Sequence, residues 1–335
     1  MEPKMMDIAR EAGVSTATVG RVLHKKGYVS PDAKKRVEEA VQKLGYVPNT
    51  LARALITKQS GIIACLVVEN AGNMHQEISR AILSAAERRG YKLFTLQSRV
   101  QVRDEDELIR QFLGLRVDGL VVVSNIYLKP EQFSFLRSKS VPVVTIERVY
   151  DVPGVDQIRF RDIEGAEEGV RQFLRRGHRR IAFLGTKPFA QTEADRLEGF
   201  RRAMENAGIP RQEQMICQTE TYNIGCGKEG MEKLLALPHP PTAVFCTADI
   251  LAAGAMQALY EQGIRVPDEI SISGYDNRIA QELAPPINSL EPNLNDLGDT
   301  AINLLMDRMN QPSLEARVEW LDMCYVDRGS IRTLL

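Results

Sequence analysis

Three residues near the N-terminus, Thr16, Ala17 and Arg21, have types and a spacing that suit contact with the edges of nucleic-acid bases. On a helix these positions fall on one side, because residues four apart lie one turn above each other. The methyl groups of threonine and alanine can contact thymine, whereas arginine can donate two hydrogen bonds to guanine. Arg21 is therefore expected to carry much of the direct base recognition.

The segment 5–23 around these residues has the pattern of two short helices joined by a tight turn. Apolar residues recur at helical spacing over 5–12, Gly13 supplies the turn, and residues 15–23 begin with a serine that can cap a helix. A third helix is expected from a Ser-Pro start to the glycine that ends it, within 30–45. The three predict a helix-turn-helix head, which places the start of its second helix at the base edges of the major groove. A helical hairpin of some other domain is the alternative.

Charge is distributed unevenly along the chain. Residues 1–60 hold eleven Lys and Arg against six Asp and Glu, whereas the remainder holds 32 against 38. This asymmetry indicates a small basic module on a mildly acidic body, as expected for a module that binds a polyanion.

The second helix of the head is not an optimal base reader. Gly20 costs it about 1 kcal/mol of helix propensity relative to alanine, and Thr16 and Ala17 offer the bases only small groups. Part of the specificity is therefore expected to come from deformation of the DNA.

The composition is that of a soluble globular protein. The 335 residues, 44% hydrophobic and 26% charged, are enough for two or three domains. No apolar run is long enough for a membrane helix and the N-terminus lacks a signal-peptide core, so we expect no membrane partner and a cytoplasmic location, on the nucleoid when DNA is bound. The five cysteines are scattered, which predicts reduced thiols rather than disulfides or a zinc site.

Motifs for catalysis are sparse. The chain has no H-E-x-x-H, G-x-S-x-G or P-loop motif, and its four histidines are far apart in sequence, so no enzyme, cofactor or metal is predicted. The stretch "GCGKEG" (225–230) matches G-x-G-x-x-G, and Asp249 follows about twenty residues later, as a ribose-binding acid would. However, polar residues separate the glycines from the nearest apolar run. A loop that opens the helix "KEGMEKLLAL" is preferred to a dinucleotide site.

The body of the chain alternates short apolar runs with helical patterns. Examples are "IIACLVV" (62–68), "GLVVVS" (119–124) and "RIAFLG" (180–185), and the helical segments between such runs end in glycine. This alternation predicts an α/β fold of parallel sheets covered on both faces. About 270 residues exceed one comfortable sheet, so two doubly wound lobes are expected, with ligands at the carboxyl ends of the strands.

The segments "DIAREAGVSTATVGRVL" and "VSPDAKKRVEEAVQKLGYVPN" resemble the DNA-binding head of the lactose and galactose repressor (LacI/GalR) family. The segment "GYVPNTLARALITKQSG" (45–61) resembles the hinge of that family, and the resemblance continues through "RRGHRRIAFLG" (175–185) to "LGDTAINLLMDRM" (297–309). The family implies a bacterial transcriptional regulator, in the usual case a repressor, that binds a palindromic DNA operator as a homodimer. It also implies a core like periplasmic binding proteins, with a small-molecule effector between two lobes.

The resemblance sets the expected domain borders. The head covers 1–47, the hinge helix and linker cover 48–61, and the effector-binding and dimerisation core covers 62–335. Within the core, lobe 1 is expected at about 62–160 plus 293–321, and lobe 2 at about 161–292 plus 322–335.

The resemblance also assigns functional residues. It implies that Leu55 is a wedge inserted into the minor groove between two central base pairs, with a linker leucine packed on the lobe as the alternative. The expected DNA contacts are Ser15, Thr16, Ala17, Thr18, Arg21, His24, Tyr28, Asn49, Arg53 and Leu55. The expected effector residues are Glu69, Met74, His75, Glu147, Arg161, Arg196, Tyr222, Asp249 and Asp276.

The effector itself stays open at this point. Met74 and His75 replace the aromatic pair of the family, and Ala248 replaces its usual amide. If Arg161 and Arg196 both point inward, a phosphorylated or carboxylated sugar derivative becomes attractive; equally, Arg161 could neutralise a nearby glutamate, Glu69 or Glu147. Another alternative is a regulator whose core serves only dimerisation or a partner protein. An exported binding protein is disfavoured, because it would need a signal peptide and would not carry the head.

Overall fold

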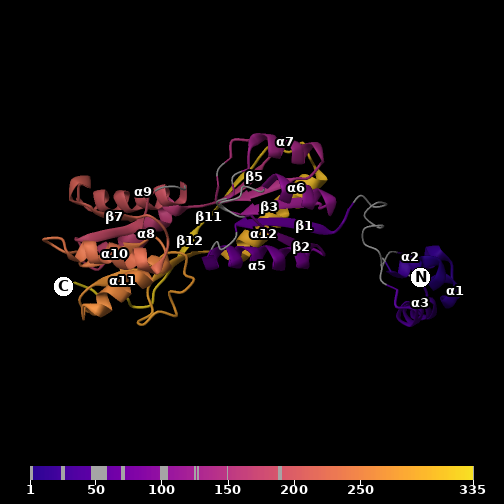
Figure 1. Ribbon diagram of the computed structural model, residues 1–335, viewed down its shortest axis with the longest axis horizontal. Coiled ribbons are helices and arrows are strands. Elements are labelled where there is room, and N and C mark those ends of the chain that lie inside the picture. Colours follow the sequence, from indigo (N-terminus) through magenta and orange to yellow (C-terminus); the bar gives the residue numbers. More distant parts are fainter. Residues whose placement is uncertain are drawn as a thin grey trace. The chain divides into compact units, whose positions relative to one another are not determined.

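The computed structural model describes residues 3–23, 27–46, 59–68, 72–98, 105–123, 126, 128–148, 150–187 and 191–334. The chain divides into two compact units, residues 1–60 and residues 61–335, which are considered separately. The first is the helical head and the second is the core, as Figure 1 shows by colour along the chain.

The head consists of three helices, α1 (Met5–Ala12), α2 (Thr16–Leu23) and α3 (Pro31–Leu44). The helix ends have the predicted caps. Gly13 and Gly45 adopt left-handed backbone conformations after α1 and α3, and the Ser30 hydroxyl caps α3 by accepting a hydrogen bond from the Ala33 amide at 3.3 Å. A small apolar core holds the helices together, with Tyr46 packed at its edge. Its buried members are Ile8, Ala9, Ala12, Val19, Val37 and Ala40.

Lobe 1 of the core is built on a six-stranded parallel sheet with the strand order β11-β5-β4-β3-β1-β2. Alternate residues of a strand face opposite sides, so the four strands β1 to β4 contribute to both apolar layers. Helices α5 (Gly72–Arg88) and α12 (Leu294–Asn310) cover one side, and α6 (Glu105–Gly114) and α7 (Pro130–Ser138) cover the other (Figure 1). The strands are β1 (Ile62–Val68), β2 (Lys92–Ser98), β3 (Gly119–Val123), β4 (Val143–Ile146), β5 (Asp156–Phe160) and β11 (Val318–Leu321).

Lobe 2 is built on a four-stranded parallel sheet with the order β7-β6-β8-β9. Helices α8 (Asp162–Arg175) and α9 (Gln191–Asn206) pack on one face, and α10 (Ile224–Leu235) and α11 (Asp249–Glu261) pack on the other. Its strands are β6 (Ile181–Thr186), β7 (Met215–Thr219), β8 (Ala243–Cys246) and β9 (Ser271–Ser273), and a short 3₁₀ helix covers Arg211–Glu213. The predicted α/β fold class is confirmed.

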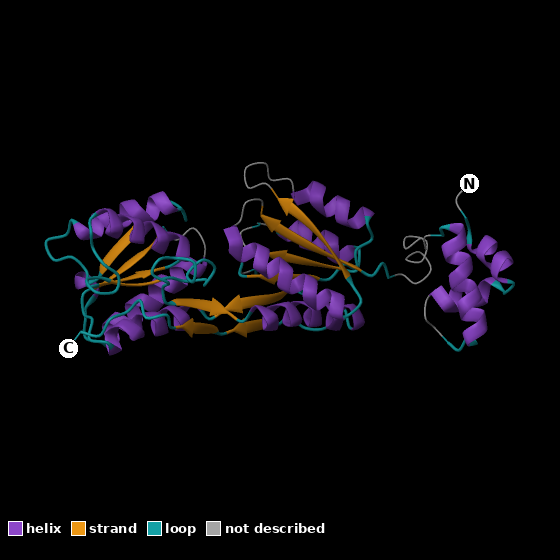
Figure 2. Cartoon of the chain, turned by 90° about the horizontal axis from the view of Figure 1, so that it is seen from below, coloured by secondary structure: helices purple, strands orange, loops and turns teal. Residues whose placement is uncertain are grey.

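Two further strands, β10 (Ser289–Pro292) and β12 (Met323–Val326), pair in the antiparallel direction. β10 lies between β9 of the second sheet and α12 of lobe 1, and β12 follows β11 of the first sheet. Figure 2 shows strands, in orange, that run between the two sheets. Where β5 leads into α8, the Arg161 amide donates to the Leu321 carbonyl at the end of β11, at 2.9 Å. The core is thus one unit whose two sheets share the chain.

The glycines of "GCGKEG" have a packing role in this fold. They lie inside α10, so the expectation of a loop opening the helix is wrong at this point. A Cβ atom on Gly227 would collide with the backbone of Leu251, and one on Gly254 with the backbone of Ile224, because α10 and α11 approach each other closely there. The Asn223 side chain caps α10 by accepting from the Cys226 amide at 2.7 Å. The glycines therefore allow helix packing, in agreement with the rejection of a dinucleotide site.

A buried ion pair fastens α12 to β5 in lobe 1. Arg308 donates to both carboxylate oxygens of Asp156, from Nε at 2.8 Å and from Nη2 at 2.9 Å, and both side chains are almost completely buried. Asp156 also accepts from the Arg317 amide at 2.9 Å. The same guanidinium donates to the carbonyl groups of Leu314 and Glu315, so the pair also fixes the segment that leads into β11.

His178 ties the C-terminal segment to the sheet of lobe 2. Its ring is buried, with Nδ1 at 2.9 Å from the Thr242 hydroxyl and Nε2 at 3.1 Å from both the Arg332 carbonyl and the Ser271 hydroxyl. Burial lowers the pKa of the His178 imidazole, because the charged form loses its hydration.

We expect this histidine to make the core less stable below about pH 6.5. The unfolded chain binds a proton at His178 near its ordinary pKa, whereas the folded chain binds it only at lower pH, so the free energy of unfolding falls as the pH drops through this window. Urea unfolding at pH 7.5 and 5.5 measures the effect, with an upper limit of about 1.4 kcal/mol per pH unit. The pH dependence should diminish in His178→Gln but not in His239→Gln, an exposed control; equal pH dependence in wild type and His178→Gln would contradict the assignment.

No described helix is both long enough and apolar enough to cross a membrane.

Candidate functional site

The exposed face of α2 presents the side chains that could contact a duplex. Thr16, Ala17 and Arg21 are all exposed, and α2 follows α1 after the left-handed turn at Gly13. This arrangement has the form of a helix-turn-helix unit, whose second helix enters the major groove with its N-terminal residues at the base edges.

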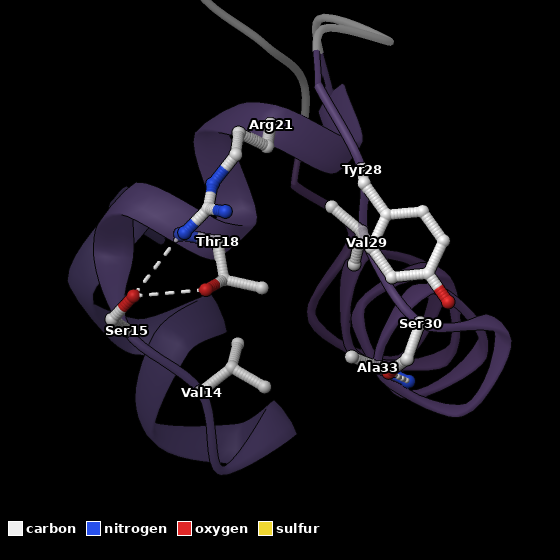
Figure 3. A pocket seen from close by; sticks show the side chains of 8 residues that line it. All are labelled: Val14, Ser15, Thr18, Arg21, Tyr28, Val29, Ser30 and Ala33. Atoms are coloured by element: carbon white, nitrogen blue, oxygen red, sulfur yellow. Dashed lines mark hydrogen bonds between the residues drawn. The ribbon is translucent and has the colours of Figure 1, made fainter.

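Ser15 and Thr18 are engaged within the head. The Ser15 hydroxyl accepts from the Thr18 amide at 3.1 Å and lies 2.9 Å from the Thr18 hydroxyl, the two bonds dashed in Figure 3. Ser15 is therefore the N-cap of α2. Each hydroxyl therefore already has a partner within the head, whereas the side chains of Thr16, Ala17 and Arg21 are exposed.

A shallow hollow lies beside this face, between α2 and the start of α3. Figure 3 shows Arg21, Thr18 and Val14 on one side of it and Tyr28, Val29 and Ala33 on the other. Tyr28 is 84% exposed, so its phenol is available at the rim. An exposed phenol suits the sugar-phosphate backbone, which accepts hydrogen bonds from such groups. The lining residues are Val14, Ser15, Thr18, Arg21, Tyr28, Val29, Ser30 and Ala33.

Gly20 lies on α2 with space for a side chain, so we expect Gly20→Ala to stabilise the head by up to about 1 kcal/mol. An added Cβ would be 3.6 Å from the Met5 methyl group, an ordinary contact. The gain is measured by hydrogen exchange of the α2 amides in the full chain. Gly13→Ala is the matched control, because Gly13 has φ +62° and alanine there should destabilise the head. Faster exchange in Gly20→Ala would contradict the expectation.

The carboxyl ends of the lobe 2 strands carry a second cluster of polar side chains, centred on Arg196. Arg196 is only 8% exposed, and its Nε donates to Asp162 at 2.9 Å and its Nη1 to the Thr247 carbonyl at 2.8 Å. Its Nη2 lies 3.3 Å from Asp276, and its guanidinium stacks 3.9 Å from the centre of the Tyr275 ring. Burial opposes the charge, but the two aspartates raise the pKa of Arg196 well above its ordinary value.

Glu193 continues this cluster one turn earlier on α9. Its carboxylate accepts from the Thr186 amide at 2.7 Å, the Thr247 hydroxyl at 3.0 Å and the Tyr222 hydroxyl at 2.5 Å. Burial raises the pKa of Glu193, although Arg196 and these donors work in the opposite direction. Tyr222 therefore joins Arg196 in one network, in which part of each side chain is already engaged by the protein. Effector contacts by these two residues stay predictions.

Asp249 anchors a turn beside this cluster. One oxygen accepts from three successive amides, those of residues 278–280, at 2.6 to 3.2 Å, and the other accepts from the Ser289 hydroxyl at 2.7 Å. Burial raises the pKa of Asp249 to about 6. The carboxylate thus anchors the turn that carries Asp276, which has the unusual φ of +85°. An effector contact by Asp249 stays a prediction, and its observed contacts are those of a positioning residue.

The expected residues of lobe 1 lie at several different places. Met74 packs against the apolar core, whereas His75 on α5 lies 3.9 Å from Glu147, the residue after β4. Arg161 is about half exposed and forms an ion pair with Asp322 at 3.0 Å, a partner that neither sequence interpretation had considered. Burial raises the pKa of Asp276, although Arg196 works in the opposite direction.

Five expected residues, His24, Asn49, Arg53, Leu55 and Glu69, lie outside the residues that the structure describes. Sequence reasoning missed Asp162, Glu193 and Thr247 as members of the lobe 2 cluster. A signal existed for Glu193, because it lies three residues before Arg196 on the same helix face. Across the described ranges, no group of three or more potential ligands could hold a metal ion.

Comparison with known proteins identifies the head and most of the second half of the chain. A family model for bacterial regulatory proteins of the lacI family matches residues 4–49, and one for a periplasmic binding protein-like domain matches residues 170–331. The chain is 32% identical over 330 residues to the HTH-type transcriptional repressor PurR of Pasteurella multocida, covering 98% of each chain. It is also 32% identical to the ribose operon repressor of Escherichia coli K12, covering 97% of this chain and 99% of the relative.

A solved structure of the lac repressor dimer bound to operator and the anti-inducer ONPF is 25% identical, with a TM-score of 0.83 and coverage of 99% of this chain and 100% of the other. The alignments cover nearly the full length of this chain and of both relatives. The chain therefore belongs to the lacI family of bacterial regulatory proteins and is a DNA-binding transcriptional regulator, not an enzyme.

Proposed function

We propose that the chain is a repressor that binds a palindromic operator as a homodimer, with Thr16, Ala17 and Arg21 at the base edges and Tyr28 at the phosphates. The observation that carries this proposal is the exposed start of α2 after the Gly13 turn, with Ser15 and Thr18 engaged in capping. A two-fold dimer places two such heads on a two-fold operator. The similar lac repressor, solved as a dimer on its operator, supports this assembly.

The core is proposed to bind a small polar effector at the carboxyl edge of the lobe 2 sheet, where Arg196, Tyr222 and Asp276 meet. Open parallel sheets bind ligands at this edge. The ribose operon repressor and the lac repressor bound to ONPF are similar along their whole length, and this supports a sugar or sugar derivative. Effector and operator then act on one equilibrium, so each changes the affinity for the other by the same factor.

The proposed domain borders are a head at 1–47, a hinge and linker at 48–61, and the two-lobed core at 62–335, with lobe 1 at 62–160 plus 293–321. The membership of β11 in the first sheet supports this division, as does the pairing of β10 with β12 beside the second. The proposed location is the cytoplasm, where operator DNA is accessible.

Selection of bound sequences from a random duplex pool tests the DNA-binding function. We expect a palindromic motif whose half-sites are contacted by one head each, with a flexible pyrimidine-purine step at the centre. Binding without sequence preference would contradict the proposal.

Thermal shift of the full chain against sugars, sugar phosphates, nucleosides and organic acids tests whether the core binds an effector. If none of them stabilises the folded chain, the result favours a core that serves only dimerisation or a partner protein.

Leu55 lies outside the described residues, and its role as a minor-groove wedge rests on the family resemblance. We predict that Leu55→Ala lowers operator affinity several-fold, because a smaller side chain cannot hold the unstacked central step open. Fluorescence anisotropy with the selected operator measures the affinity, and analytical ultracentrifugation should give the same assembly state for both proteins. Equal operator affinity would remove Leu55 from the mechanism.

A further inference from the structure

We infer that the outer edge of β11 is a docking site for an extended segment of a partner protein, one that turns apolar and acidic side chains toward Trp320. The segment would add to the sheet of lobe 1 as one more strand. The inference goes beyond the proposed operator and effector functions, because it concerns neither the head nor the cluster around Arg196.

The backbone of β11 is open on one side. In the part of the chain that the structure describes, β5 is the one strand paired with it. The carbonyl groups of Arg317 and Leu321 accept from amides of β5 and of the residue after it, at 2.9 Å each. Because backbone groups alternate in direction along a strand, the N–H and C=O groups of Val318 and Trp320 point away from β5. Such a row of unpaired groups is a template on which an extended peptide can add to a sheet.

The side chains of Val318 and Trp320 make one face of this edge apolar. As alternate residues of β11 they lie on the same face of the sheet, and they are 43% and 41% exposed. Leu321, on the other face, packs against the apolar core of lobe 1. Exposed edge strands are normally protected by charged residues or proline. A partner strand that covers Val318 and Trp320 would therefore gain apolar burial in addition to backbone hydrogen bonds.

Two arginine side chains set the charge of this face. The Arg159 guanidinium lies over the Trp320 ring, 4.4 Å from its centre, and the Arg161 guanidinium lies 5.7 Å from the same centre. Arg161 is already paired with Asp322 at 3.0 Å, whereas no acid within the described ranges forms an ion pair with Arg159. The face therefore keeps a positive charge beside its apolar surface, and a carboxylate of the partner complements it.

These charges favour an acidic peptide over a second copy of the chain or a nucleic acid. Two β11 strands placed edge to edge would bring guanidinium groups of like sign together, which destabilises strand pairing. A nucleic acid would meet two exposed acids, Glu319 and Asp322, which repel phosphate groups. Glu319 lies on the face opposite Trp320, because side chains alternate along the strand. A peptide with its acidic residues at alternate positions can place all of them on the Trp320 face and avoid both conflicts.

The emission of Trp320, the single tryptophan of the chain, reports on this site directly. The full chain is titrated with a blocked pentapeptide that has a central valine, a threonine on either side and a glutamate at each end, so that the valine and both glutamates share one face. We expect a saturable change of the emission and slower hydrogen exchange of the Val318 and Trp320 amides. The same peptide with lysine ends should bind at least tenfold more weakly, which corresponds to about 1.4 kcal/mol. A peptide with proline at its three central positions should also bind more weakly, because proline cannot donate a backbone hydrogen bond.

Substitutions connect the signal to the edge of β11. Val318→Pro removes an N–H that points away from β5, so it should abolish peptide binding and leave the sheet folded, which urea unfolding verifies. Arg159→Gln should remove the preference for glutamate over lysine ends. Arg110→Gln removes the same charge from an exposed position on α6 and should leave binding and preference unchanged.

Three results would overturn the inference. The first is no saturable change with the glutamate peptide, or equal binding by wild type and Val318→Pro. The second is a change of assembly state in Val318→Pro, seen by analytical ultracentrifugation, which would assign the edge to a second copy of the chain. The third is saturation of the Trp320 emission by single-stranded oligothymidine, which would assign the edge to nucleic acid. Operator selection and effector titrations are independent of these measurements, so the proposed function stands or fails separately.

Discussion

Arg21→Ala lowers the affinity for the selected operator by roughly ten- to a hundredfold, in line with about 1–3 kcal/mol for one arginine contact to a base. The reason is that Arg21 is the longest donor on the exposed face of α2, where its neighbours Thr16 and Ala17 offer only small groups. With alanine at position 21, the preference for one base at the contacted position should also relax. Anisotropy titrations against the operator and against a set of single-base variants measure both effects.

A matched control separates base recognition from charge. Arg10→Ala removes the same charge from α1, where Arg10 is highly exposed and lies 3.9 Å from Asp7 in a weak ion pair. It should change the affinity for all sequences alike and leave the base preferences unaltered. If Arg21→Ala instead weakens binding uniformly, Arg21 is a phosphate contact. Specificity would then have to come from Thr16, Ala17 and the deformation of the central step.

The helical head could be predicted from sequence because its determinants are local. Gly13, Ser15 and Gly45 each affect backbone groups within a few residues, and the structure has the corresponding turn, cap and helix end. The alternation of apolar runs and helices likewise predicts parallel sheets, because a strand that is apolar on both sides must be covered by helices on both faces of the sheet. These features need no knowledge of which distant segments meet.

The effector cluster could not be predicted in the same way, because its partners are far apart in sequence. Arg196 meets Asp162 and Asp276, which are 34 and 80 residues away, and the contact depends on the strand order. Alignment to a family gives the positions but not which of them are already engaged. That is why Asp249 was expected at the ligand and anchors a turn, and why the pairing of Arg161 with Asp322 was not foreseen.

Asp156→Ala should destabilise the core by about 3–5 kcal/mol, the largest stability effect that we expect from one substitution in this chain. The variant leaves the buried guanidinium of Arg308 without its carboxylate, and a buried charge without a partner is strongly unfavourable. It also deprives the Arg317 amide of its acceptor. Urea unfolding followed by the fluorescence of Trp320, the single tryptophan of the chain, measures the loss, because Trp320 lies on β11 next to β5.

A neighbouring acid provides the control for this substitution. Asp307 pairs with Arg317 at 2.9 Å, but its side chain is 53% exposed, so Asp307→Ala should cost less than about 1 kcal/mol. Comparable losses for Asp156→Ala and Asp307→Ala would contradict a special role for the buried pair. The head should be unaffected by either change, because it is a separate unit with its own apolar core.

Removal of both Asp156 and Arg308 shows whether their ion pair stabilises the core or mainly selects one arrangement of it. Desolvation of two charges can cancel most of their attraction, so an apolar pair of similar volume can be as stable as the ion pair. The double variant Asp156→Leu with Arg308→Met should therefore recover a large part of the stability lost in Asp156→Ala. However, Arg308 also holds the carbonyl groups of Leu314 and Glu315 before β11. We expect the double variant to keep faster hydrogen exchange in that segment, because methionine cannot replace those two bonds.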